Sequence, residues 1–162
     1  RRPGEDWESF VYRVSVYPAL GMNVFVVGGD MSGTSGQGLR PIPEHESRFG
    51  NFCVTRMGQA SSPSNLIVFA SARHGTGEDD RGTGFHKIHS PRFTGDRWAA
   101  QWDPDLPADA FGFVDLRWDG KAVVSTLDGG VRLMGLEELR DMRHWSDQAA
   151  RADDPDWTIS RL

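Results

Sequence analysis

Cysteine is almost absent from this chain of 162 residues, which contains Cys53 alone. A single cysteine cannot form an internal disulfide bond, and it cannot supply a cysteine-rich zinc site. Because Cys53 stands between Phe52 and Val54, we interpret it as a small buried apolar residue. A catalytic thiol would need a neighbouring base, and the sequence indicates none.

Long apolar runs are also missing. No stretch approaches the ~18 residues of a membrane-spanning helix, and no signal peptide is visible. The chain opens with Arg1-Arg2-Pro3-Gly4 and no initiator Met, from which we expect an internal start and a native N-terminus further upstream. The net charge is -5 and basic residues are scattered, which argues against a nucleic-acid partner.

The motifs of common enzyme classes are not found. Gly28–Gly38 is rich in glycine but lacks the Lys-Ser/Thr pair of a phosphate-binding loop. His86 and His89 are three residues apart, a spacing that puts them on opposite faces of a strand, so they would not share a metal. Neither a zinc-protease motif nor a nucleophile elbow occurs. We therefore expect a protein that is not an enzyme and has no cofactor.

The most informative stretch is Phe111–Trp145, where β-rich runs are separated by two Asp-Gly pairs. Asp119-Gly120 and Asp128-Gly129 predict two-residue type I′ turns, which need positive φ at both central residues. The stretch is thus predicted to form three strands joined by two turns. The first turn would pair Trp118 with Lys121, Leu116 with Val123 and Val114 with Ser125. The second would pair Leu127 with Gly130 and Val124 with Leu133.

This register makes both faces of the meander apolar. One face would carry Phe113, Ala122, Val124, Val131 and Leu133, and the other Val114, Leu116, Trp118, Val123, Leu127 and Met134. A sheet with one solvated face alternates more cleanly, so we expect a cover on each side. A helix predicted over 136–145 provides one cover through Leu136, Leu139 and Met142. The second cover is expected to be a helix absent from this chain.

The remaining pattern predicts an α+β fold with an antiparallel sheet, long irregular loops and few helices. Further strands are predicted at Phe10–Tyr17, Met22–Val27, Asn51–Met57, Asn65–Ala72 and Phe85–Ser90, with the very apolar 65–72 run at the centre of the sheet. We expect one globular domain over 1–162. It comprises N-terminal strands and a Gly-rich loop in 1–65, the central strand, meander and helix in 66–146, and a polar tail in 147–162.

Two places could bind a ligand. Glu78, Asp79 and Asp80 form a compact acidic loop of the kind that binds calcium, although a solvated loop is the simpler interpretation. The cluster Asp153-Asp154-Pro155-Asp156 is interpreted in the same way. Trp98 and Trp102 would offer a platform to a carbohydrate or a protein if they were exposed side by side, and would otherwise hold irregular loops to the sheet.

Several segments resemble bacterial prepilin-like, or pseudopilin-like, proteins. The similar pieces are VDLRWDGKAVVSTLDGGV at 114–131 and ELRDMRHWS at 138–146, with further likeness at 17–18, 21–23, 25–30 and 64–72. Many such proteins have a His, nine residues and then Asp-Gly, often followed by another His. Here Asp128-Gly129 is present, but Trp118 and Gly130 stand at the two histidine positions, so any role of those histidines is lost.

The resemblance implies a long N-terminal helix, half embedded in the membrane and half packed on an antiparallel sheet. It also implies other pilin-like subunits as partners, in a type II secretion or type IV pilus-like filament, and a place in the cell envelope or at the cell surface. The chain would then be the soluble head of a non-enzymatic structural subunit. A module that binds carbohydrate or protein through the Trp-bearing loops is the alternative.

Overall fold

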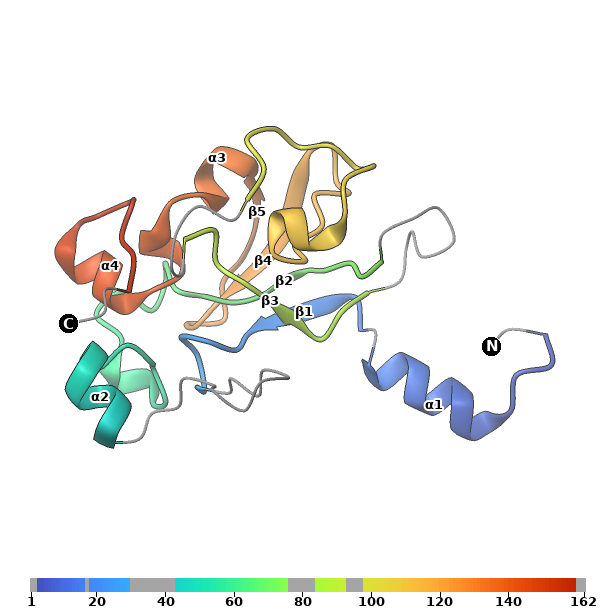
Figure 1. Cartoon of the computed structure of the whole chain (residues 1–162), viewed down its shortest axis with the longest axis horizontal. Helices are drawn as coiled ribbons and strands as arrows, with labels where there is room; N and C mark the ends of the chain where they lie inside the picture. Colours follow the sequence, from blue (N-terminus) through green and yellow to red (C-terminus); the bar gives the residue numbers. More distant parts are fainter. Residues whose placement is uncertain (1–2, 17, 30–42, 76–83, 93–97, 160–162) are drawn as a thin grey trace.

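A computed structural model describes residues 3–16, 18–29, 43–75, 84–92 and 98–159 (Figure 1). It confirms an α+β fold, built on a five-stranded sheet with short helices. The helices are α1 (Trp7–Val16), α2 (Pro43–Phe49), α3 (Leu136–Leu139) and α4 (Asp147–Ala152), and the strands are β1 (Leu20–Asn23), β2 (Ile67–Ser71), β3 (Lys87–Ile88), β4 (Lys121–Thr126) and β5 (Val131–Gly135). Short 3₁₀ helices span Met57–Gln59, Ala108–Phe111 and Met142–His144.

The strands are ordered β3-β1-β2-β4-β5 across the sheet. All neighbours are antiparallel except β1 and β3, which run parallel. The apolar run 65–72 forms β2, the middle strand, as its composition predicted. Its position lets β2 exchange hydrogen bonds with β1 on one side and β4 on the other.

The strand predicted at Phe10–Tyr17 is wrong, because residues 10–16 belong to the helix α1, while Tyr17 lies outside the described residues. The carboxylate of Asp6 accepts a hydrogen bond from the backbone N–H of Ser9 at 2.8 Å, which caps the first turn. Apolar side chains then recur at helical spacing at Trp7, Phe10 and Val11, and again at Val14. The partial alternation that suggested a strand is outweighed by this cap and this period.

Three other predicted strands are much shorter than expected. Of the predicted strand Met22–Val27, only Met22 and Asn23 belong to β1. The chain then turns, and the backbone N–H of Val27 donates to the carbonyl of Asn23 at 3.1 Å. Asn51–Met57 contributes only an isolated bridge between Val54 and Val27. Of Phe85–Ser90 only Lys87–Ile88 pairs with β1. The apolar residues at the centre of these segments are buried, among them Phe25–Val27, Phe52–Val54 and Ile88, but pairing partners limit how much of each segment becomes strand.

The core has two parts. The larger cluster lies on one face of the sheet, where it includes Ile67, Val124, Met134 and Trp145. The C-terminal elements α3, the 3₁₀ helix at 142–144 and α4 lie over this region, as the orange and red ribbons of Figure 1 show. A smaller cluster at another part of the sheet contains Phe25–Val27 and Phe52–Val54, with Met22 and Val68 packed against it.

The single helix predicted over 136–145 is broken into α3 and the 3₁₀ helix at 142–144. The break occurs at Asp141, whose side chain caps the second piece by accepting from the backbone N–H of Arg143 at 2.9 Å. Leu139 and Met142 are nevertheless fully buried, as the predicted stripe requires, and Leu136 packs against the same cluster. The segment after 147, predicted as a polar tail, forms α4 and buries Ala149 and Ile159.

Candidate assembly surface

The turn at Asp119-Gly120 has the predicted conformation. The φ angles are 54° for Asp119 and 72° for Gly120, as a type I′ turn requires. Trp118 and Lys121 exchange two backbone hydrogen bonds of 3.1 Å each, so the predicted pairing of these two residues is confirmed.

The segment before this turn does not pair with β4, and the predicted pairs Leu116–Val123 and Val114–Ser125 are wrong. Val114 instead bridges Ala72, and the backbone N–H of Asp115 donates to the carbonyl of Ser71 at 2.8 Å. Residues 113–115 and β4 therefore lie one after the other along the same edge of β2, and 113–115 does not lie beside β4. The reason is that β2 already occupies the edge of β4 that the predicted meander needed.

The turn at Asp128-Gly129 differs from the prediction by one residue. The backbone N–H of Thr126 donates to the carbonyl of Gly130 at 2.9 Å, which leaves a three-residue loop. Only Gly129 in this loop has positive φ, at 88°, as expected for a type I turn followed by a left-handed residue. Asp128 accepts hydrogen bonds from the Thr126 hydroxyl and the Gly130 N–H, and these hold the pKa of its carboxyl below the ordinary value.

The one-residue slip changes which side chains share a face. The observed register pairs Val123 with Leu133 and Ala122 with Met134, so the predicted pairing of Val124 with Leu133 and of Leu127 with Gly130 is wrong. Shifting a strand by one residue moves each side chain to the opposite face. Met134 consequently lies with Ala122 in the core, while Leu133 lies with Val123 on the other side of the sheet.

Part of the face opposite the main core is apolar and exposed to solvent, while Met22, which pairs with Phe69, packs against the smaller cluster. We call this exposed part the open face and define it by five residues of four strands: Leu20, Phe69, Val123, Val131 and Leu133. The registers place them together, since Leu20 faces Ser71, Phe69 faces Ser125, Ser125 faces Val131, and Val123 faces Leu133. Val131 is 69% exposed and Leu133 52%, whereas Val123 is half-buried. An apolar sheet face of this kind is typical of an interaction surface.

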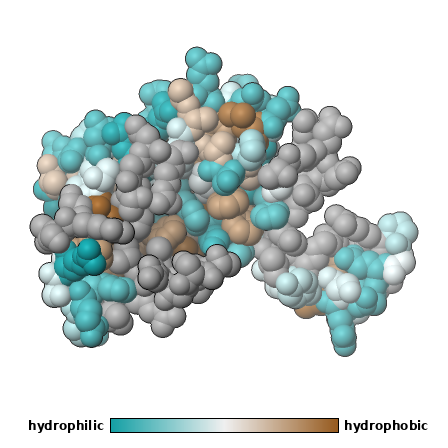
Figure 2. All heavy atoms as spheres, in the orientation of Figure 1, coloured by the Kyte–Doolittle hydropathy of each residue, from teal (hydrophilic) through white to brown (hydrophobic). Residues whose placement is uncertain are grey.

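A second apolar surface lies on α1. Its residues Trp7, Phe10, Val11 and Val14 follow the i, i+3, i+4, i+7 spacing and form what we call the α1 stripe. The rings of Trp7 and Phe10 lie 5.4 Å apart, and Trp7 is 65% exposed. Figures 1 and 2 show α1 as a lobe that stands apart from the body of the protein. The prediction of a strand here hid this stripe, although its spacing is visible in the sequence.

Pro18 and Ala19, which lie between α1 and β1, both contact the body of the protein. The carbonyl of Ala19 accepts from the backbone N–H of Ala72 at 3.0 Å. Gly84 packs so closely on the carbonyl group of Pro18 that a Cβ at position 84 would collide with it. Both residues that precede β1 are therefore anchored to the sheet.

The two tryptophans predicted as a ligand platform do not form an exposed pair. Trp98 is buried, with its ring edge-on to Trp145 at 5.8 Å and to Phe111 at 6.5 Å. Trp102 is half-buried, lies 4.7 Å from the Phe111 ring and is covered by the guanidinium of Arg73 at 5.1 Å. A shallow hollow of about 470 Å³ adjoins Trp102. Both rings thus attach the 98–111 region to the core.

The acidic loop Glu78-Asp79-Asp80, predicted as a calcium candidate, lies outside the described residues. Within the part of the chain that the structure describes, no group of three or more His, Cys, Asp or Glu side chains is arranged to hold a metal ion.

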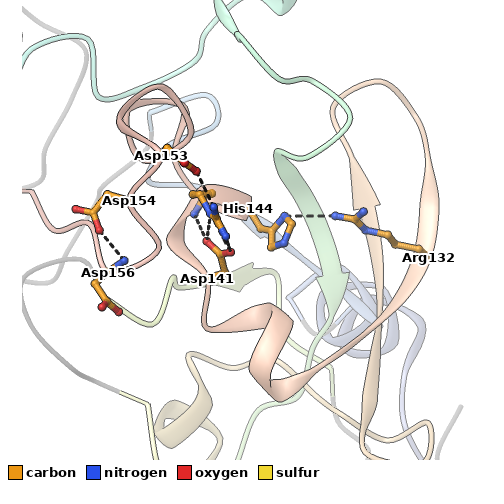
Figure 3. Close-up of polar contacts among 7 residues, drawn as sticks. Arg132, Asp141, His144, Asp153, Asp154 and Asp156 are labelled. Carbon is orange, nitrogen blue, oxygen red and sulfur yellow. Dashed lines mark hydrogen bonds and ion pairs between the residues drawn. The ribbon is translucent and has the colours of Figure 1, made fainter.

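The second acidic cluster is engaged in ion pairs and turns (Figure 3). Arg143 bridges Asp141 and Asp153 with contacts of 2.6 Å each, and its hydrogen bond lowers the pKa of Asp141. Asp154 accepts from the backbone N–H of Asp156 at 2.9 Å, and Asp156 pairs with Arg92 at 2.8 Å. The ion pairs of Asp141 and Asp153 with Arg143 close the C-terminal segment onto the 3₁₀ helix at 142–144.

Cys53 is buried, and burial together with the nearby charge of Glu46 raises the pKa of its thiol to about 11. The group is thus a protonated, shielded thiol at neutral pH, which fits the predicted role as a small apolar residue. Among the described helices, none is long and apolar enough to cross a membrane.

No protein-family model, curated protein or solved structure matches this chain.

Proposed function

We propose that this chain is a non-enzymatic structural subunit, the head of a pilin-like protein, and that its open face is an assembly surface. The observation that carries the proposal is the one-sided sheet. One face is covered by the chain's own C-terminal elements, whereas the other presents Phe69, Val131 and Leu133 to solvent. Apolar area of this kind is stabilised when another element covers it.

The resemblance of 114–131 and 138–146 to pilin-like proteins gives the proposal its biological setting: a type II secretion or type IV pilus-like filament at the cell envelope. In such a subunit a helix packs against an antiparallel sheet, and the loops of the head point away from the filament. The alternative, a carbohydrate- or protein-binding module, needs Trp98 and Trp102 at the surface. The burial of Trp98 favours the structural role.

Two measurements test the proposal. The first is the coding sequence upstream of Arg1, where a short basic leader followed by about 20 apolar residues is expected. An upstream region without such a segment would remove the pilin setting.

The second measurement is incorporation into surface filaments, in the cells that make the protein. The substitution Leu133→Asp puts a charge on the open face and is expected to remove the chain from the filaments sheared off the cells. The matched control Gln101→Asp places the same charge on an exposed loop residue elsewhere and is expected to leave incorporation unchanged. Equal incorporation of both variants would contradict an assembly role for the open face.

A further inference from the structure

The strand β5 is an edge strand, since β4 is its one neighbour in the described sheet. Val123 lies opposite Leu133, but the backbone N–H of Val123 donates toward β2, to the hydroxyl of Ser71 at 3.1 Å. Val123 and Leu133 are therefore a pair without mutual hydrogen bonds, and the N–H and C=O of Leu133 point away from β4. Because backbone direction alternates along a strand, those of Val131 and Gly135 point away from β4 as well.

The outward groups of β5 differ in what they bond. The N–H of Gly135 donates to the carboxylate of Glu138 at 3.0 Å, which agrees with its outward direction. The outward N–H and C=O groups of Val131 and Leu133, by contrast, have no hydrogen-bond partner among the residues that the structure describes, and both residues are exposed. We call these four groups the β5 edge. A row of such groups is a template for a further strand.

A positive charge stands at the middle of the β5 edge. Arg132 lies between Val131 and Leu133, and its exposed guanidinium forms no ion pair within the described parts of the chain. The guanidinium lies 3.4 Å from Nδ1 of His144 (Figure 3), and its charge acts on Asp128 at longer range. Arg132 is therefore available to an acidic group that approaches the edge.

We infer that the β5 edge binds an extended strand of another protein, antiparallel to β5, with an acidic residue opposite Arg132 and apolar residues opposite Val131 and Leu133. Backbone hydrogen bonds hold the added strand, as in other cases in which a peptide extends a sheet. Its acidic residue faces Arg132 in a pair without backbone hydrogen bonds, where side chains lie closest. Its apolar side chains lie beside those of Val131 and Leu133, because residues opposite each other share a face. The bonds are made by the edge of the sheet rather than by its open face, so this binding does not require the pilin setting.

Two observations disfavour a second copy of this chain as the added strand. Pairing that uses both Val131 and Leu133 of each copy places Arg132 directly opposite Arg132 of the second copy, and like charges in this position are destabilising. A shift by two residues places Val131 opposite Gly135 of the second copy, whose N–H already has an acceptor, or Leu133 opposite the turn residue Gly129. The partner is therefore a chain of different sequence, with a carboxylate where β5 has a guanidinium.

Amide hydrogen exchange with a strand-forming probe is the first test. The probe is a short synthetic peptide with Val-Glu-Val at its centre, threonines on both sides and an N-methyl group on the glutamate, so that it offers one edge only. In the free protein the amides of Val131 and Leu133 are expected to exchange fast, since they have no acceptor. Saturating peptide should slow both by about tenfold or more, while Arg132 and Met134, which are bonded to β4, exchange slowly throughout.

A matched control peptide has the same side chains but carries its N-methyl groups on the two valines, whose N–H groups face β5. It should neither bind nor protect the two amides. Equal binding of both peptides would overturn the inference, because side chains on the open face would then make the contact. A first peptide that does not bind, or that protects another part of the sheet, would overturn it as well.

An exchange of charges tests the role of Arg132. By fluorescence anisotropy at low salt, the wild type is expected to bind the Val-Glu-Val peptide roughly fivefold to tenfold more tightly than a Val-Lys-Val peptide, because repulsion replaces attraction. Arg132→Glu should reverse this preference, and binding of the lysine peptide shows that the variant is folded. The matched control Arg56→Glu, at an exposed position elsewhere, should keep the wild-type preference. An unchanged preference in Arg132→Glu contradicts the inference.

Sedimentation equilibrium without peptide tests the choice of partner. The wild type is expected to sediment as a monomer of 18.0 kDa, with fast exchange at Val131 and Leu133. A dimer in which these two amides are already protected would overturn the inference and assign the β5 edge to a second copy. A monomer in which they are protected would overturn it too, because another segment of the same chain would then occupy the edge.

Discussion

The side chain of Asn23 links the sheet to its C-terminal cover through Trp145, 122 residues further along the chain. The Asn23 amide nitrogen donates to the carbonyl of Trp145 at 3.2 Å and to that of Ile67 at 3.0 Å, and all three residues are fully buried. A polar residue in this place stabilises one particular docking of the helical segment, because its single amide group binds a carbonyl of β2 and a carbonyl of the C-terminal segment at once.

This link predicts that Asn23→Ala lowers the free energy of unfolding by about 1–3 kcal/mol, since two buried carbonyls lose their donor. The measurement is urea unfolding of the purified protein. Asn51→Ala, at an exposed position, is the matched control and is expected to change stability by less than ~0.5 kcal/mol. Equal effects of the two substitutions would contradict the structural role of Asn23.

Gly129 is the left-handed residue of the 127–129 loop, and its substitution is expected to lower stability through backbone strain alone. Gly129 has φ of 88°, and a Cβ there would have no atom within 4 Å. Gly129→Val should therefore destabilise the protein by about 1–3 kcal/mol through the conformation it must adopt.

Gly58 offers the control for this experiment, because its surroundings are equally open but its φ is not positive. Gly58→Ala should change the melting temperature little. Gly129→Asn should fall between the two, because asparagine tolerates the left-handed region better than valine does. Tolerance of valine at position 129 would count against the observed turn.

His144 predicts a loss of stability in mildly acidic solution. Burial, together with the nearby Arg132, whose guanidinium lies 3.4 Å from Nδ1 of His144 (Figure 3), lowers the pKa of the imidazole from 6.5. The unfolded chain therefore binds more protons than the folded one between 6.5 and the folded pKa. Stability is expected to fall as the pH drops through this range, and to be restored as the pH rises above 6.5.

Urea unfolding at a series of pH values across this range measures the effect. His144→Gln removes the group and should flatten the pH dependence. Arg132→Gln should narrow the pH range between 6.5 and the pKa of folded His144, because it removes a cation that disfavours the imidazolium form. Unfolding with the same pH dependence in all three proteins would show that His144 does not contribute.

Substitution by alanine is expected to lower stability much more at Trp98 than at Trp118. Trp98 is buried against Phe111 and Trp145, so Trp98→Ala should cost about 3–5 kcal/mol of stability. Trp118 is 54% exposed at the type I′ turn, so Trp118→Ala should cost much less. Thermal unfolding checks both. A small effect at Trp98, accompanied by binding of a carbohydrate by the wild type, would favour the alternative of a binding module.

Much of the sheet could be predicted from local pattern. The run 65–72 is the most apolar of the chain and contains the middle strand, in which Ile67 and Ala70 are fully buried in the main core. The Asp119-Gly120 turn was predicted from two residues whose backbone preference is strong. Leu139 and Met142 were placed in the core by their spacing, although the helix that carries them is broken at Asp141.

The candidate assembly surface could not be predicted to the residue. Asp128-Gly129 is compatible with both a two-residue and a three-residue loop, and the Thr126 hydroxyl bound to Asp128 favours the longer one here. That single residue of register decides whether Leu133 lies in the core or on the open face. The pairing of 113–115 with β2 was likewise invisible, because it depends on a strand more than 40 residues away.

The sequence alone determined the composition class, the α+β fold, the central strand and the conformation of one tight turn, all of which follow from preferences within a few residues. Tertiary structure decided the register of β5, the helical state of 7–16 and the identity of the open face. These depend on which long-range partner occupies each strand edge and each apolar side, and no local pattern records that competition.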